Sequence, residues 1–106
     1  MSKIWVYVDQ TKISATVLME LHRILEEPIG VIKSRIETSA ALATFALFYN
    51  DHDDVTQKLR AIIYNIPAAG ANLRFFETPE EQTTCTASDE ISGETLENIL
   101  TTKNQA

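Results

Sequence analysis

The stretch DDVTQKLRAIIYNIPAAGANLRFFE, residues 53–77, predicts a helix, a turn and a strand in succession. Its apolar residues repeat at i, i+4, i+7, i+8 and i+11, namely Val55, Leu59, Ile62, Ile63 and Ile66. This spacing gives the helix one apolar face. The helix is expected to stop at Pro67, and AAGAN supplies a turn around Gly70 before the strand NLRFFE at 72–77. A helix of this kind needs a second layer to cover its apolar face, so the stretch indicates an α/β fold.

The N-terminal half of the chain supplies the other strands and helices. IWVYVD at 4–9 has apolar residues at both even and odd positions, which is typical of a central strand. SATVLMELHRILEE then changes to helical spacing, with Ser14 or Thr16 as the N-cap. Pro28 ends this helix and suits the first turn of a second one, which ends near Thr38. LATFALFY at 42–49 alternates and predicts the second strand.

The fold class that we expect is α/β (α+β), a two-layer sandwich with three strands and three helices on one face. The element order is β-α-α-β-α-β within one domain at 1–77. Residues 78–106 form an acidic, threonine-rich extension with a short helix near 92–101, for which Ser92 is a possible cap.

Residues 15–77 resemble in pattern the C-terminal domain of the bacterial ribosomal stalk protein and the N-degron protease adaptor. VIKSRI at 31–36 and the stretch at 53–77 carry the resemblance. The resemblance implies a fold, and it implies no functional residues. The stalk domain uses lysine-rich helices, whereas residues 18–37 hold three bases and four acids. The adaptor's Asn-Asp pair follows its first strand, whereas Asn50-Asp51 follow the second strand here.

Charge and cysteine content exclude several classes of function. Of the net charge of −6, residues 78–106 contribute most, because they hold six acids and Lys103 alone. No basic patch exists to attract nucleic acid, whereas an acidic segment could attract a basic protein. A single cysteine, Cys85, excludes an intrachain disulfide and favours a reducing compartment. The apolar run at the start is too short for a signal peptide or a membrane span, so we expect a cytoplasmic protein.

The acidic joint YNDHDD at 49–54 has two interpretations. Asp51, His52, Asp53 and Asp54 could ligate a divalent cation. The favoured interpretation is that Asn50 or Asp51 caps the following helix and that the acids complement its positive end. Cys85 has no neighbouring base, and three scattered glycines cannot build a phosphate loop. We therefore expect a non-enzymatic protein with no cofactor and no metal.

Aromatic residues on the uncovered face of the sheet are the predicted interface. If Ile4 and Val6 face the helices, Trp5 and Tyr7 face the other way, joined by Phe48 or Tyr49 and by Phe75 or Phe76. Three arrangements are possible: the C-terminal segment covers this face, a second copy covers it, or a different protein binds it. The candidate residues are Trp5, Tyr7, Phe48, Tyr49, Phe76, Leu96, Ile99 and Leu100.

The function expected from these features is protein binding, either to itself as a homodimer or to another protein. A bacterial toxin-immunity protein fits the small size, the acidity and the lack of catalytic residues. The alternatives are a regulatory or adaptor domain of stalk-like fold and a metal-binding protein that uses Asp51–Asp54.

Overall fold

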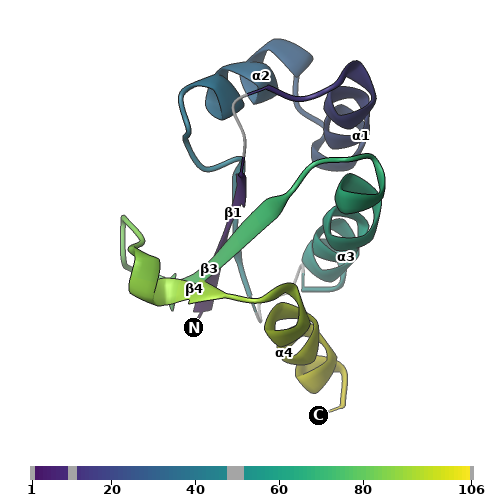
Figure 1. Cartoon of the computed structure of the whole chain (residues 1–106). Helices are drawn as coiled ribbons and strands as arrows, with labels where there is room; N and C mark the ends of the chain where they lie inside the picture. The colour runs from purple at the N-terminus through teal and green to yellow at the C-terminus, as the bar shows by residue number, and fades with distance from the viewer. Residues whose placement is uncertain (1, 10–11, 48–51, 106) are drawn as a thin grey trace.

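The computed structural model describes residues 2–9, 12–47 and 52–105, with side chains placed for these residues except His52 and 102–105. The described chain is a mixed α/β fold with a four-stranded antiparallel sheet and four helices (Figure 1). The elements are β1 (Ser2–Val8), α1 (Ala15–Leu25), α2 (Ile29–Glu37), β2 (Ala43–Ala46), α3 (His52–Ala68), β3 (Leu73–Pro79), a 3-10 turn (Ala87–Asp89), β4 (Glu90–Ile91) and α4 (Gly93–Gln105).

Strand β1 lies in the middle of the sheet, as its two apolar faces predict. The strand order is β2-β1-β3-β4, and β1 pairs antiparallel with both β2 and β3. Ile4 and Val6 are fully buried in the core that the helices cover. Because side chains alternate along a strand, Trp5 and Tyr7 point to the opposite face. The predicted division of β1 between two faces is confirmed.

Local capping residues and turns set the ends of α1 and α2. Ser14, one of the two predicted caps, starts α1, and its Oγ accepts a hydrogen bond from the N–H of Val17 at 3.3 Å. Pro28 precedes α2 as predicted. Helix α2 ends in a turn in which the Ala40 N–H donates to the Arg35 carbonyl at 2.9 Å, and this turn places Ser39 at φ 58°.

The predicted apolar face of α3 is the centre of the core. Val55, Leu59, Ile62 and Ile66 are buried, and Ile63 is half-buried against them. The helix runs one residue beyond Pro67 before the turn at Gly70, where φ is 106°. Proline has no N–H to donate to the carbonyl four residues earlier, and α3 ends one residue after Pro67.

The sheet has a fourth strand that the sequence did not predict. Strand β4 pairs with β3, so that Phe75 lies opposite Ile91 and Phe76 lies opposite Glu90. Two residues are too few to show an alternating pattern, which explains why the strand was missed. The predicted C-terminal helix is present as α4, where the Ser92 Oγ accepts a hydrogen bond from the Thr95 N–H at 3.0 Å.

Of the three possible arrangements, cover of the far face by the apolar residues of the C-terminal helix is not the one observed. Leu96 and Leu100 are fully buried in the same core as Ile4, so they are not available as interface residues. Ile99 is half-buried against that core. Helix α4 lies beside α3 on the helix side of the sheet (Figure 1). The physical reason is that its apolar residues complete the cluster that α3 alone leaves uncovered.

Strand β2 is shorter than the predicted 42–49. Leu42 and Leu47 still donate backbone hydrogen bonds to β1, at 2.7 Å to Val6 and 2.9 Å to Ser2. Phe48 and Tyr49, which we predicted as interface residues, lie outside the described residues. Within the described ranges, none of the helices is long and apolar enough to cross a membrane.

Substitution of Leu96 tests whether α4 is part of the core. We expect Leu96→Ala to lower the free energy of unfolding by about 2–5 kcal/mol, because it leaves a cavity among fully buried side chains. Urea denaturation measures the change. Ile99→Ala, at a half-buried position on the same helix, is the control and should cost less. Equal stability of Leu96→Ala and the parent chain would show that α4 does not contribute to the core.

The positive φ of Ser39 predicts a stabilising substitution. Ser39→Gly should raise the free energy of unfolding by roughly 0.5–1 kcal/mol. Glycine removes the cost of holding a Cβ in the left-handed conformation, and this gain exceeds the extra chain entropy that glycine loses on folding. Ser34→Gly, at an exposed position inside α2, is the matched control and should be destabilising. A thermal unfolding curve for each variant decides the sign.

Candidate functional site

The face of the sheet opposite the helices carries the candidate site. The register of β1 and β3 places Lys3 opposite Thr78, Trp5 opposite Phe76 and Tyr7 opposite Arg74. Opposed residues of an antiparallel pair share a face. This face therefore carries three aromatic side chains and two cations. Trp5, Tyr7 and Phe76, which the sequence predicted as interface residues, lie next to one another on it.

The aromatic residues of this face are more buried than the sequence suggested. Trp5 and Phe76 are 8% and 6% exposed, so they do not form the exposed patch that we expected. The Trp5 Nε1–H donates to the Thr78 Oγ1 at 2.9 Å, and the Lys3 Nζ lies 4.6 Å from the indole centroid. The Arg74 guanidinium lies 5.3 Å from the Phe76 ring centroid. Thr78 accepts the hydrogen bond of the indole N–H, and Lys3 and Arg74 lie over the two rings. The spacing of residues along one strand cannot show such contacts between strands.

Tyr7 is half-buried and is therefore more accessible than Trp5 and Phe76 on the same face. Its ring meets Phe76 edge-on, with centroids 5.3 Å apart and an interplanar angle of 80°. Its hydroxyl lies 3.5 Å from the Cys85 Sγ, at hydrogen-bonding distance. Burial of the phenol, followed by the contact with Cys85, raises the pKa of Tyr7 to about 12. The hydroxyl is therefore a neutral hydrogen-bonding group at physiological pH.

An ion pair ties β3 to β4 beside Tyr7. The Arg74 Nε and Nη2 donate to the two carboxylate oxygens of Glu90 at 3.0 and 2.9 Å. This two-bond geometry is the one in which a guanidinium fits a carboxylate best. The hydrogen bonds from Arg74 lower the pKa of the Glu90 carboxyl. The pair fixes the direction of the guanidinium and cancels its charge locally.

The connection between β3 and β4 is held by local hydrogen bonds and forms one side of the candidate site. The Thr86 N–H donates to the Asp89 Oδ2 at 2.8 Å, and the Thr86 hydroxyl lies within 3.3 Å of the same oxygen. The Gln82 amide donates to the Thr84 carbonyl at 2.6 Å. These local bonds hold Cys85 over the sheet. The sequence reads as a polar linker here, and nothing in it indicates that Cys85 would reach Tyr7.

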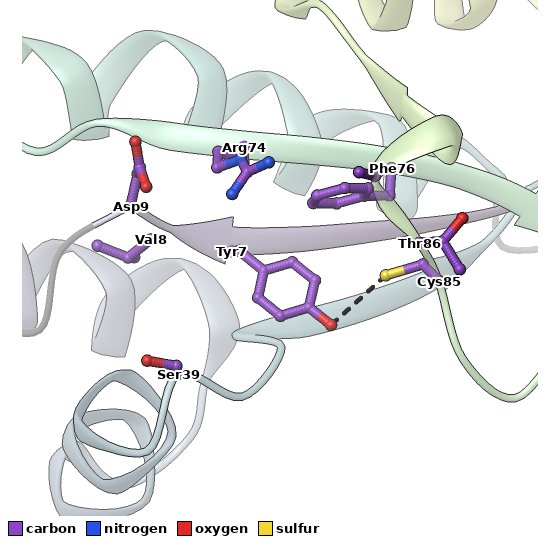
Figure 2. A pocket seen from close by; sticks show the side chains of 9 residues that line it. Tyr7, Val8, Asp9, Ser39, Arg74, Phe76, Cys85 and Thr86 are labelled. Carbon is purple, nitrogen blue, oxygen red and sulfur yellow. Dashed lines mark hydrogen bonds between the residues drawn. The ribbon is translucent and has the colours of Figure 1, made fainter.

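A hollow of about 500 Å³ lies between these groups (Figure 2). Tyr7 and Phe76 line it from the sheet, Cys85 lies on the side of the β3–β4 connection, and Ser39 lies beyond the end of α2. The complete lining is Tyr7, Val8, Asp9, Ser39, Arg74, Phe76, Cys85, Thr86 and Ala87. Four separate segments of the sequence meet here, at 7–9, 39, 74–76 and 85–87. Sequence reasoning found Tyr7 and Phe76 but missed Asp9, Ser39, Arg74 and Cys85.

The Cys85 thiol has no general base beside it among the described residues of the hollow. The polar neighbour of the Cys85 thiol is a phenol with a raised pKa, which is a poor base at neutral pH. The Arg74 charge is held by Glu90, and the Asp9 side chain is exposed. The lining therefore offers an aromatic surface, one carboxylate and a set of hydroxyl and thiol groups, but no nucleophile paired with a base.

The acidic joint is described only in part. Asn50 and Asp51 lie outside the described residues, and so does the side chain of His52. Asp53 and Asp54 are exposed in the first turn of α3, and Asp54 lies 3.5 Å from the Lys58 Nζ. Within residues 2–9, 12–47 and 52–105, no cluster of three or more His, Cys, Asp or Glu side chains could hold a metal ion.

We compared the chain with protein-family models, with curated proteins and with solved structures, and none of the three comparisons found a match.

The raised pKa of Tyr7 predicts a loss of stability in alkali. A folded-state pKa of about 12 against an ordinary value of 10.0 means that the unfolded chain releases the proton first as the pH rises. The contribution of Tyr7 is thus complete below pH 10 and is lost as the pH rises toward 12. Urea denaturation at pH 9 and pH 11 should show a smaller pH effect for Tyr7→Phe than for the parent chain. An equal pH effect would contradict the burial of the phenol.

Proposed function

We propose that this chain is a small, non-enzymatic protein-binding domain that uses the hollow above β1 and β3. The observation that carries the proposal is the accessible Tyr7 ring, seated on Phe76 at 5.3 Å in a hollow of about 500 Å³. Aromatic residues are enriched at protein interfaces because they combine a large apolar area with a polar group. Binding also fits a lining in which ion pairs and hydrogen bonds are already formed.

The charge at the hollow favours a partner that presents a basic side chain. Arg74 lines the hollow and pairs with Glu90 outside it, so these two residues and the exposed Asp9 together carry one net negative charge. A lysine or arginine could place its charged group near Asp9 and its alkyl chain on the Tyr7 ring. The net charge of −6 would also steer a basic protein toward the domain.

The acidity of the C-terminal segment supports this proposal less than its charge count suggests. Glu90 is paired with Arg74. Glu97 accepts hydrogen bonds from the Arg60 Nε at 3.0 Å and from the Tyr64 hydroxyl at 2.6 Å. These two carboxylates are already paired within the chain, so Asp9 and the hollow are the better candidates for contact with a basic partner.

A toxin-immunity protein is the more specific form of the proposal, supported by size, net charge and the exposed Asp9 in the hollow. An adaptor domain related to the stalk-like fold is the second form, supported by the element order from β1 to β3. The neighbouring gene separates them: a large toxin gene directly upstream supports immunity, and an unrelated operon contradicts it.

Selection from a random peptide library tests the binding proposal directly. Peptides selected on the immobilised chain should carry arginine or lysine beside an apolar residue, because these groups complement Asp9 and Tyr7. Their affinity, measured by fluorescence anisotropy, should fall at least about tenfold with Tyr7→Ala, the order of loss seen when an interface aromatic is truncated.

Tyr64→Ala is the matched control for this experiment. Tyr64 lies on α3, is 62% exposed and does not line the hollow, so its loss should leave peptide binding unchanged. Asp9→Asn should weaken basic peptides selectively. Peptides that bind Tyr7→Ala and the parent chain equally would show that the hollow is not the binding site.

A further inference from the structure

Strand β2 forms an edge of the sheet with one open side. The strand order places β1 next to β2, and no other described strand pairs with β2. An open edge presents a row of backbone donors and acceptors that a further strand can pair with. The edge of β2 could therefore pair with a strand from another molecule, and this surface is separate from the hollow on the sheet face.

The register identifies the backbone groups that point outward. The Leu47 N–H donates to the Ser2 carbonyl at 2.9 Å, and the ladder pairs Phe45 with Ile4 and Ala43 with Val6. The backbone N–H and C=O groups of successive residues in a strand point in opposite directions, so those of Ala43, Phe45 and Leu47 point toward β1. The N–H and C=O groups of Thr44 and Ala46 consequently point away from β1.

Strand β2 carries no charged residue and no proline, two of the features that protect an edge. Natural edges carry a lysine, a proline, an inward-pointing charge or a bulge, or they are very short. The sequence ATFA at 43–46 contains neither charge nor proline. Irregular pairing is confined to the start of the strand, where Ala43 is the partner of Val6 and the preceding Leu42 N–H also bonds to the Val6 carbonyl. The opposite edge differs, because β4 is two residues long and carries Glu90 in its ion pair with Arg74.

A groove of about 390 Å³ runs beside this edge and leaves room for a partner. Phe45 and Leu25 contribute its apolar surface, and Arg35 and Lys58 line it from α2 and α3. Both cations are already ion-paired within the chain: Arg35 lies 2.8 Å from Glu27, and Lys58 lies 3.4 Å from Glu26 and 3.5 Å from Asp54. The two cations and three carboxylates nearly balance, so this edge does not share the strong negative charge of the whole chain.

We propose that β2 pairs antiparallel with β2 of a second copy of this chain, about a two-fold axis at Phe45. In this register Thr44 of one copy lies opposite Ala46 of the other, and each such pair exchanges its outward N–H and C=O groups. The two sheets become one continuous sheet. The symmetric contact is isologous, so the dimer closes and does not extend into a fibre.

Self-complementarity favours a second copy over a foreign peptide. At the axis the two Phe45 side chains form a non-hydrogen-bonded pair, the arrangement in which opposed side chains approach most closely. The nearly balanced charges beside the groove allow the same patch to face itself without strong repulsion. The contact is small, so we expect dissociation in the micromolar range or weaker.

Sedimentation velocity over a wide range of protein concentration tests the proposal. The parent chain should pass from monomer to dimer as the concentration rises. Thr44→Pro removes one outward N–H and no hydrogen bond within the chain, a change that edge strands tolerate. We expect this variant to weaken dimerisation at least tenfold. Thr44→Val keeps the N–H and the strand preference, so it should dimerise like the parent chain.

Amide hydrogen exchange on the parent chain gives a second measurement that needs no variant. Exchange at Thr44 and Ala46 should slow as the protein concentration rises, whereas Ala43 and Phe45, which already bond to β1, should change little. A parent chain that stays monomeric, with concentration-independent exchange at Thr44 and Ala46, would overturn the proposal. A dimer that Thr44→Pro leaves intact would also overturn it. Tyr7→Ala should not affect the dimer, so failure here is distinguishable from failure of peptide binding at the hollow.

Discussion

The burial of β1 on both of its faces is the constraint on which the rest of the structure depends. Ile4 and Val6 face the helix-covered core, and Trp5 lies on the other face with 8% exposure. A strand buried on both faces must lie inside the sheet and must find cover on each side. The helices provide one cover. On the other face the cover comes from Lys3, Arg74 and the connection that carries Cys85.

The C-terminal segment serves both sides of that strand. Leu96 and Leu100 of α4 fill the core next to α3. The connection before β4 holds Cys85 over Tyr7 on the far face. Two ion pairs, Arg74 with Glu90 and Arg60 with Glu97, join this segment to the body of the domain. Each pair alone contributes little because it is partly exposed, and its value is that it fixes the position of the segment.

Two surfaces remain incomplete once these requirements are met, and each is incomplete in a different way. The hollow exposes an aromatic ring and a carboxylate, so it suits a side chain from a partner. The β2 edge exposes backbone donors and acceptors, so it suits another strand. The hollow lies over the face of β1 and β3 that is opposite the helices, whereas the open edge belongs to β2, which pairs with β1 on the side away from β3. A dimer through β2 would therefore leave both hollows open to partners.

The sequence by itself determined the elements whose apolar residues follow a clear period. The α3 face at Val55, Leu59, Ile62 and Ile66 and the two faces of β1 are predictable, because spacing along one element decides which side chains turn the same way. Ser14 and Ser92 were predictable as caps because capping uses residues close in sequence. The α/β class and the order of the first six elements follow from these features.

The tertiary structure alone decided where the C-terminal segment goes and what the candidate site contains. Strand β4 has two residues, and its position depends on pairing with β3. Cys85 reaches Tyr7 across 78 positions of sequence, and Ser39 and Arg74 join the hollow from separate elements. Contacts of this kind depend on the geometry of the sheet and its connections, for which local spacing carries no signal. The sequence therefore determined which residues turn toward a core, and the packing of the sheet decided which residues form a site.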